Sequence, residues 1–170
     1  MPEKPVILDL YCGTGTIGLS LSDLADHVLG VESVRPAVID ANRNAVINGI
    51  VNAEFLCGKA EEVLPKMFET APLGGEDYRP CLVFPSGFTA PADVVIVDPP
   101  RAGCDPRLLE AAALAGPSRL IYVSCDPATL ARDLKVLGEK GYVPRLVRPV
   151  DMFPHTAHVE TVVLMSRVKD

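Results

Sequence analysis

The segment YVSCDPATLARDL, residues 122–134, contains a thiol at the point where an apolar run gives way to a helical pattern. Asp126 is a preferred N-terminal cap of a helix, and Pro127 is a preferred first helical residue. We therefore expect Cys125 at the end of a strand and at the positive end of a helix, which favours the thiolate and nucleophilic chemistry. The cap carboxylate opposes this effect in part. The alternative is a buried structural cysteine.

A nucleophilic cysteine needs a base from elsewhere in the fold. The segment DMFPHTAHVETVVLM, residues 151–165, supplies a candidate in Glu160, which opens an otherwise apolar strand-like run. His155 and His158 could bind a metal ion, but the sequence suggests no third ligand, and packing or hydrogen bonding is the simpler role. We therefore assign the base to Glu160 and predict no metal site.

Two further features fit a cofactor that contains adenosine. Gly13, Gly15 and Gly18 follow an apolar run, where glycines allow a tight turn and a close approach of a ligand to the backbone. Glu32 ends the next strand-like run, and a carboxylate there can accept hydrogen bonds from both hydroxyls of a ribose. A structural turn and an ordinary helix cap would use the same residue types.

The segment DPPRAG, residues 98–103, narrows the choice of cofactor. Asp98 leaves a predicted strand, and the two prolines after it stiffen the backbone and lack N–H groups. Such a segment can hold polar groups against the edge of a planar base beside a methyl donor, whereas a dehydrogenase has no evident use for it. The alternative is a proline pair that only ends a strand.

The elements that must position these residues alternate along the chain. We expect strands at residues 6–11, 27–32, 53–57, 93–98, 119–124, 142–150 and 159–166. We expect helices at residues 16–25, 35–50, 105–115 and 127–141, and an interrupted helix at residues 60–69. Residues 71–92 contain many prolines and glycines and are predicted to form an inserted surface loop.

This alternation predicts one α/β domain, in which helices cover both faces of a doubly wound, mostly parallel sheet. The last two strands have no helix between them and are expected to form an antiparallel edge. In such sheets ligands bind beyond the carboxyl ends of the strands, near the reversal of strand order. The segments described above follow or begin strands, so we expect them to meet at that edge.

Composition excludes several classes of protein. The chain has 170 residues, of which 48% are hydrophobic, and no apolar run is long enough to span a membrane. A net charge of −6 argues against a general nucleic-acid coat protein. The first residues do not resemble a signal peptide, and the five cysteines include no Cys-x-x-Cys pair, which favours a reduced, cytoplasmic setting.

Together, LDLYCGTGTIGL, DPPRAG, YVSCDPATLARDL and DMFPHTAHVETVVLM closely resemble the RNA 5-methyluridine methyltransferases, which use S-adenosyl-L-methionine and act on tRNA or ribosomal RNA. The resemblance runs from residue 5 to residue 166, with an interruption at the 71–92 loop. It implies a Rossmann-like class I methyltransferase fold, S-adenosyl-L-methionine as cofactor, and a uridine in RNA as partner.

The resemblance also implies roles for individual residues. It assigns the nucleophile to Cys125 and the proton acceptor to Glu160, and it assigns cofactor contacts to Tyr11, Gly13, Gly15, Thr16, Glu32 and Asp98. Arg101 is expected either to orient its loop or to meet a phosphate. Thr16 stands where Asn is common, and Asp126 stands where Asn or Lys is frequent, which could change how the thiolate is stabilised.

The implied reaction is methylation of carbon 5 of a uridine through a covalent Cys125 adduct. Members of this family are far longer, so the resemblance implies that residues 1–170 are a C-terminal catalytic domain without its N-terminal RNA-binding parts. One alternative is a cofactor-binding fragment that is inactive without those parts. Another is a nucleic-acid methyltransferase acting on an exocyclic nitrogen, which needs no cysteine. The target uridine and the oligomeric state stay open.

Overall fold

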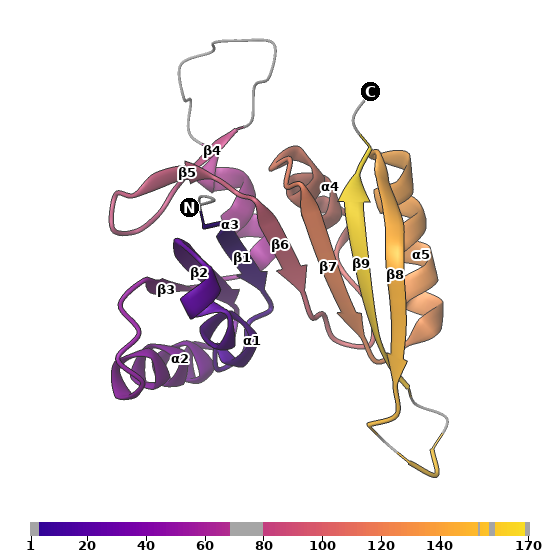
Figure 1. Cartoon of the computed structure of the whole chain (residues 1–170), viewed down its shortest axis with the longest axis horizontal. Helices are drawn as coiled ribbons and strands as arrows, with labels where there is room; N and C mark the ends of the chain where they lie inside the picture. The colour runs from indigo at the N-terminus through magenta and orange to yellow at the C-terminus, as the bar shows by residue number, and fades with distance from the viewer. Residues whose placement is uncertain (1–3, 69–79, 153, 157–158, 169–170) are drawn as a thin grey trace.

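A seven-stranded sheet forms the centre of the protein (Figure 1). The computed structural model describes residues 4–68, 80–152, 154–156 and 159–168. The strand order is β3-β2-β1-β6-β7-β9-β8. The strands are β1 (Val6–Leu10), β2 (His27–Glu32), β3 (Ala53–Cys57), β6 (Val94–Val97), β7 (Arg119–Ser124), β8 (Tyr142–Val150) and β9 (Glu160–Arg167).

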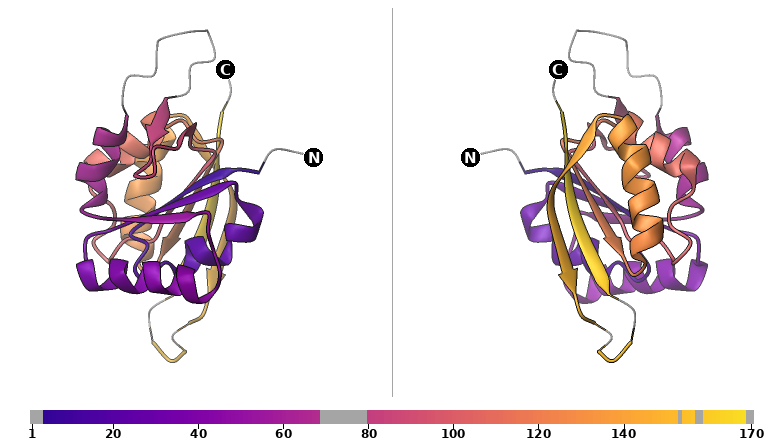
Figure 2. Two further views of the ribbon diagram at one scale, coloured as in Figure 1. Left: turned by 90° about the vertical axis from the view of Figure 1, so that its left-hand side faces the viewer. Right: turned by 90° about the vertical axis from the view of Figure 1, so that its right-hand side faces the viewer.

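Helices cover both faces of this sheet (Figure 2), which confirms the predicted doubly wound α/β fold. One layer contains α1 (Thr16–Ser20), the 3-10 helix η1 (Ser22–Leu24) and α2 (Arg35–Ile47). The other contains α3 (Ala60–Met67), α4 (Pro106–Leu114) and α5 (Pro127–Glu139). Within the described ranges, no helix combines the length and the apolar character that crossing a bilayer would require.

The central strand β1 shows how one segment serves both layers. All five of its residues are buried, as expected for a parallel strand with helices on each face. Val6, Leu8 and Leu10 belong to the large core cluster under α3, α4 and α5, whereas Ile7 joins the smaller cluster under α1 and η1. Asp9 interrupts this apolar run and faces the α1 layer, so the strand delivers one carboxylate to the interior.

The predicted antiparallel edge is confirmed, with one refinement. β9 pairs antiparallel with both β7 and β8, so β8 runs in the direction of the central strands and only β9 is reversed. β8 is the edge strand, and it contains Pro144 and Pro149. Because proline has no N–H to donate, these residues oppose pairing with a further strand.

Two predicted helices need correction. The helix expected at residues 16–25 is divided into α1 and η1, and the Ser20 and Ser22 hydroxyls donate to the backbone carbonyls of Thr16 and Leu19. Such side-chain bonds compete with a regular helix. The helix expected to be interrupted, α3, is continuous and includes Pro65.

The surface loop predicted at residues 71–92 is wrong for its second part. Cys81–Val83 and Thr89–Pro91 form the strands β4 and β5 of an antiparallel hairpin, and residues 71–79 of the predicted loop lie outside the described residues. Leu82 and Phe84 are buried in the large core cluster. The many prolines and glycines of this segment indicated a loop, but burial of these two apolar side chains packs the hairpin against the domain.

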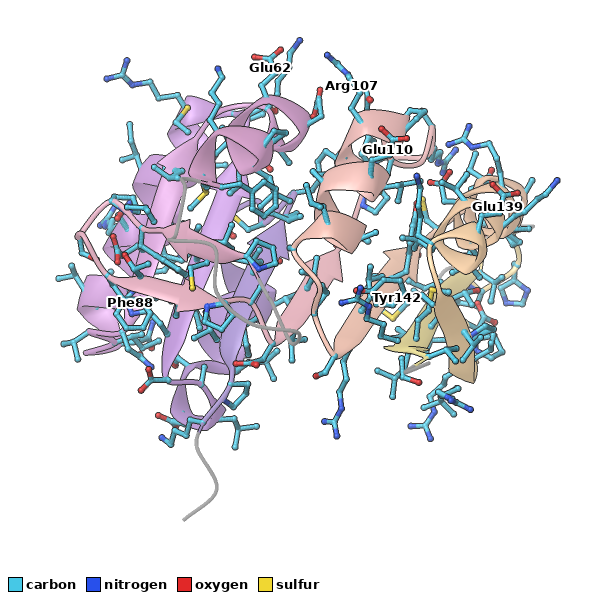
Figure 3. The ribbon with its side chains drawn as sticks, turned by 90° about the horizontal axis from the view of Figure 1, so that it is seen from above. Glu62, Phe88, Arg107, Glu110, Glu139 and Tyr142 are labelled. Carbon is cyan, nitrogen blue, oxygen red and sulfur yellow. The ribbon has the colours of Figure 1, made fainter. Side chains whose placement is uncertain are left out.

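A polar cluster joins the hairpin to the sheet. The Glu54 carboxylate lies 2.6 Å from His27 Nε2, and it accepts hydrogen bonds from the Ser86 N–H (2.8 Å) and hydroxyl (2.5 Å). The His27 ring stacks on Phe88, which Figure 3 labels, with centroids 4.8 Å apart, and it meets Phe84 edge to face at 5.0 Å. Burial alone would raise the pKa of Glu54, but the bonds from Ser86 and His27 together hold it below its ordinary value.

Replacing Glu54 by Gln should therefore destabilise the protein by about 1–2 kcal/mol near neutral pH, because Ser86 and His27 lose a charged acceptor. The folded-state pKa of Glu54 is lowered, so its contribution is complete above the ordinary value of 4.5 and disappears as the pH falls below it. Urea unfolding of wild type and E54Q at several pH values measures this difference. The exposed Glu139 on α5 (Figure 3) provides the control E139Q, and equal destabilisation by both changes would contradict the prediction.

Candidate active site

The strand order reverses at β1, which has β2 on one side and β6 on the other. In parallel sheets this reversal opens a crevice at the carboxyl ends of the strands. The loop after β1, the end of β2, and the residues after β6 and β7 all lie at this edge, the lower edge of the sheet in Figure 1. β9 begins at the same edge because it is reversed. The predicted site residues therefore share one edge of the sheet.

The loop after β1 has an unusual backbone. Tyr11, Gly13 and Gly15 have φ angles of 64°, 54° and 81°, in the left-handed region that costs a non-glycine residue about 1–2 kcal/mol. The N–H groups of Tyr11 and Cys12 both donate to the Val31 carbonyl, at 2.9 and 3.2 Å, which holds the loop against β2. Strained backbone of this kind is concentrated at functional sites.

The two glycines of this loop have different reasons to be glycine. A Cβ at Gly15 would lie 2.8 Å from the Phe55 ring, so packing excludes a side chain there. A Cβ at Gly13 would meet no described atom within 4 Å. The space beside Gly13 is therefore open to a ligand that approaches the backbone.

Glu32 is held beside this loop. Its Oε2 accepts a hydrogen bond from the Gly13 N–H at 3.1 Å, and its Oε1 accepts from the Val34 N–H at 2.8 Å and the Ser33 hydroxyl at 3.1 Å. An ionised carboxylate has about four acceptor positions, so one stays free on Oε2, and rotation of the exposed Ser33 hydroxyl would free a second. Glu32 can thus receive two hydroxyl donors without moving.

The other predicted cofactor residues divide between two places. Thr16 is exposed, pairs its hydroxyl with that of Thr14 at 3.3 Å, and lines a polar surface hollow between α1 and α2. Tyr11 is half-buried, and its ring packs toward the large core cluster. Its phenol accepts a backbone hydrogen bond at Asp105, in the loop that follows β6. Burial is the main cause that raises the pKa of this phenol, against that bond.

Three carboxylates are near enough for the charge of each to act on the next, and we call Asp9, Asp98 and Glu160 the carboxylate row. Asp9 is fully buried, its Oδ2 accepts from the Gly18 N–H at 2.8 Å, and its Oδ1 has no partner among the described residues. Glu160 also has a buried oxygen, Oε2, without a partner among those residues. Unpaired buried acceptors are costly, so the row is suited to a ligand that brings positive charge or donors.

The charges of the carboxylate row act on one another. Burial raises the pKa of Asp9 to about 6, against the Gly18 hydrogen bond, and the charge of Asp98 adds to the increase. Burial, followed by repulsion from Glu160, raises the pKa of Asp98. The residue patterns alone predicted no role for Asp9. The feature that could have indicated one is its position as the single acidic residue inside the apolar run VILDL.

Cys125 and Glu160 are brought together by strand register. Ser124, the last residue of β7, pairs with Thr161 of β9, so Cys125 follows and Glu160 precedes the same cross-strand pair. Opposite residues of an antiparallel pair have Cβ atoms about 5 Å apart, which brings the two side chains within reach of one substrate. They are 35 residues apart in the sequence, and only this pairing makes them neighbours.

The predicted start of α5 is confirmed. Asp126 Oδ1 accepts hydrogen bonds from the N–H groups of Ala128 and Thr129 at 2.9 and 3.0 Å, and Pro127 is the first helical residue. Cys125 is half-buried at this helix start. Cys12 and Cys104 are buried instead, and burial raises the pKa of each to about 12, so both stay protonated near neutral pH.

The histidines of the last segment are placed less fully. His155 is exposed, with φ at 68°, and His158 lies outside the described residues. Across the described part of the chain, no three His, Cys, Asp or Glu side chains gather closely enough to hold a metal ion.

The raised pKa of Asp9 predicts an unusual pH dependence of stability. Between its ordinary value of 3.8 and about 6, the native protein keeps a proton that the unfolded chain has lost, so the free energy of unfolding should fall as the pH rises. Relative to D9N, wild type should lose about 2 kcal/mol between pH 4.5 and 7.5. Urea titrations of wild type, D9N and the exposed control D40N measure this, and parallel profiles for wild type and D9N would contradict it.

Comparison with known proteins identifies the family of this chain. The family model described as tRNA (Uracil-5-)-methyltransferase matches residues 2–168. A protein of Bacillus cereus named an uncharacterized RNA methyltransferase is 50% identical over 163 residues, which cover 96% of this chain and 32% of that protein. The chain thus spans about a third of the length of the curated relatives it matches.

Solved structures show the same fold. The tRNA (uracil-54, C5)-methyltransferase of Pyrococcus abyssi, in complex with S-adenosyl-L-homocysteine, is 38% identical with a TM-score of 0.71, and the match covers 97% of this chain and 34% of that one. An rRNA methylase of Streptococcus thermophilus has a TM-score of 0.68 at 14% identity, over 98% of this chain and 89% of that one, which shows the fold alone. From the match over nearly its whole length, this chain belongs to the tRNA (uracil-5-)-methyltransferase family.

Proposed function

We propose that this chain is the catalytic domain of an RNA methyltransferase that methylates carbon 5 of a uridine in tRNA or ribosomal RNA, with S-adenosyl-L-methionine as methyl donor. The observation that carries the proposal is the pairing of Ser124 with Thr161, which brings Cys125 and Glu160 to one point of the sheet edge. Membership of the uracil-5 family supports the reaction, and the bound S-adenosyl-L-homocysteine of the Pyrococcus abyssi enzyme supports the cofactor.

The residues of the candidate site fit this cofactor. Glu32 would hold the ribose hydroxyls, and the open space beside Gly13 allows the cofactor to lie against the loop. The sulfonium and ammonium groups of the cofactor carry positive charge, which complements the negative charge of the carboxylate row. The Oδ1 atom of Asp9, which has no partner among the described residues, supports this complementarity. The cofactor supplies an electrophilic methyl group.

The chain's own residues would perform the remaining chemistry. Carbon 5 of uracil is a weak nucleophile, so the Cys125 thiolate adds to carbon 6, and the electron pair of the carbon 5–carbon 6 double bond moves toward the oxygen on carbon 4. Carbon 5 of this enolate would then take the methyl group as the bond between that methyl carbon and sulfur breaks, which would leave S-adenosyl-L-homocysteine. Glu160 removes the carbon 5 proton, the double bond reforms, and the thiolate of Cys125 leaves.

A flipped uridine is the substrate form that this geometry requires. Cys125 and Glu160 both have to approach the faces of the uracil ring at carbon 6 and carbon 5. In a stacked base the neighbouring bases cover those faces, so neither side chain could reach them. The target base therefore has to leave its stack to enter the site.

The role of Glu32 can be tested without RNA. The change E32Q should weaken binding of S-adenosyl-L-methionine about 10- to 100-fold, because a charged acceptor of two hydroxyl donors is lost. Isothermal titration calorimetry measures the affinity. The change E110Q removes an exposed carboxylate on α4 (Figure 3) and should leave it unaltered. Equal affinity of E32Q and wild type would contradict the assignment of Glu32.

The covalent step can be tested with an RNA stem-loop that contains 5-fluorouridine. After methyl transfer carbon 5 has no proton for Glu160 to remove, so the adduct should persist and shift the protein band on a denaturing gel. C125A should abolish this band, while C57A, which removes the exposed thiol at the end of β3, should keep it. With ordinary uridine RNA, E160Q should accumulate an adduct that wild type resolves.

The outcomes distinguish the candidate functions. Methylation that survives in C125A would indicate transfer to an exocyclic nitrogen. Cofactor binding without any adduct or methylation would favour a cofactor-binding domain that is inactive alone. The chain's coverage of about a third of its relatives makes this the second candidate. Repeating the assay with a full-length relative would then test whether the remaining two thirds restore the reaction.

A further inference from the structure

A buried carboxylate on α5 holds the loop that follows β6. Asp133 is 1% exposed, and its Oδ2 accepts hydrogen bonds from the Cys104 N–H at 2.8 Å and the Tyr122 hydroxyl at 2.6 Å. Its Oδ1 accepts from Arg132 Nε at 2.8 Å. Each oxygen is therefore satisfied, which is the condition under which a charge can remain in the core.

Two further bonds run from the same helix to the same loop. Arg132 Nη2 donates to the Ala102 carbonyl at 2.9 Å, and the Thr129 hydroxyl donates to the Arg101 carbonyl at 3.1 Å. Together with the bond to Cys104, they bind residues 101, 102 and 104 of the loop. We call Thr129, Arg132 and Asp133 the loop clamp.

The residue between these anchor points has to be glycine. Gly103 has a φ of 78°, and a Cβ there would lie 2.5 Å from Arg132 Nη2 and 2.6 Å from Asp133 Oδ2. The left-handed backbone and the absent side chain allow the loop to come this close to the helix. The glycine of DPPRAG thus serves the clamp, and the space beside it is filled.

The clamp links two predicted site residues through one rigid element. Asp98 begins the clamped loop, and Cys125 directly precedes Asp126, the N-cap of α5. The Arg101 carbonyl accepts from Thr129 in the first turn of α5. Hydrogen bonds from Thr129 and Ala128, and then the charge of Arg101, lower the pKa of Asp126. Movement of the loop away from α5 would therefore change the position of Asp98 relative to the thiol of Cys125.

We propose that the loop clamp is a positioning device, with Asp133 at its centre, that holds the Asp98 loop against the helix of Cys125 in the geometry that the reaction needs. The proposal rests on the proposed function. Asp133 acts through the loop and does not touch the reacting atoms. Of the predicted cofactor contacts, Asp98 lies in the clamped loop, whereas Glu32 and the loop after β1 lie on the other side of the strand reversal, so the clamp should affect the reaction step more than cofactor affinity.

The test compares D133N with a buried control. D133N replaces one acceptor oxygen of the carboxylate by a donor, and Y142F removes the hydrogen bond of 3.0 Å from the buried Tyr142 to the Pro117 carbonyl. Tyr142 is the first residue of β8, so it lies where the parallel strands begin, whereas Cys125 lies where they end (Figure 1). Figure 3 labels the Tyr142 side chain. Both changes disturb hydrogen bonding of a buried side chain, and the control does so away from the clamp.

The rate of uridine methylation is measured per molecule that binds S-adenosyl-L-methionine, together with the dissociation constant of the cofactor. D133N should lower kcat about 10- to 100-fold, the cost of a misplacement near 1 Å, while cofactor affinity changes less than about threefold. Y142F should lower the thermal midpoint by roughly 3 °C and keep the wild-type kcat. A purely structural role of Asp133 would make the two variants alike in kcat, and that result would overturn the proposal.

A milder variant covers the case in which D133N does not fold. T129V removes a half-buried hydroxyl, with its bond of 3.1 Å to the Arg101 carbonyl and its contacts of 3.2 and 3.3 Å with the Asp126 carbonyl and carboxylate. It should lower kcat by about three- to tenfold without a change in cofactor affinity. A wild-type kcat in T129V would overturn the proposal if D133N cannot be measured.

Failure of the proposed function gives a different result. If wild type methylates no uridine, alkylation of Cys125 by iodoacetamide, read by mass spectrometry in the C57A background, tests the clamp alone. A change of more than about threefold in the alkylation rate of D133N, with none in Y142F, would support the clamp, because the clamped loop lies against the first turn of the helix that Cys125 precedes. Equal rates in all three proteins would overturn it.

Discussion

The candidate active site depends on the reversed direction of β9. This strand lies between β7 and β8 and is antiparallel to both, so its second residue, Thr161, pairs with Ser124, the last residue of β7, and Glu160 lies next to that pair. If β9 ran parallel to β7, its eight residues would carry Glu160 to the opposite edge of the sheet, roughly 25 Å away. The hairpin from β8 to β9 therefore does more than close the sheet, because it brings a carboxylate to the side of the sheet where parallel strands end.

The same edge concentrates groups that oppose folding. Tyr11 has a left-handed backbone, and two oxygens of the carboxylate row are buried without a partner among the described residues. Each such feature costs free energy, and the continuous burial of β1 and its neighbours on both faces offsets that cost. The distribution is typical of a site prepared for a ligand, since local strain and unpaired charge persist where bound groups would satisfy them.

The two helix layers have different roles around this edge. The α1 layer contacts the loop after β1. There the Gly18 N–H donates a hydrogen bond to Asp9, and the Glu32 carboxylate accepts one from the Gly13 N–H. On the other face, α5 begins at Asp126 and holds the loop after β6. The cofactor side and the nucleophile side of the candidate site are thus supported by separate elements, and the strand reversal between β1 and β6 lies between them.

Much of the fold could be predicted because its signals are local. Apolar runs and helix caps involve residues within a few positions of one another, and the bonds of Asp126 to Ala128 and Thr129 are an example. The local frequency of prolines and glycines gave a wrong prediction where apolar side chains pack against residues far away in the sequence. Phe84 and Phe88, surrounded by prolines and glycines, pack on the His27 ring, and the expected loop became a hairpin.

Local residue patterns were enough to establish the order and type of most elements and the residue types at the strand ends. Which of those residues meet depends on the packing of the folded chain. Glu160 reaches Cys125 through strand register, Asp9 is buried against Gly18, and Asp133 binds a loop about 30 residues before it. The physical reason is that pairing register and burial depend on the packing of whole elements, whereas propensities and caps depend on near neighbours.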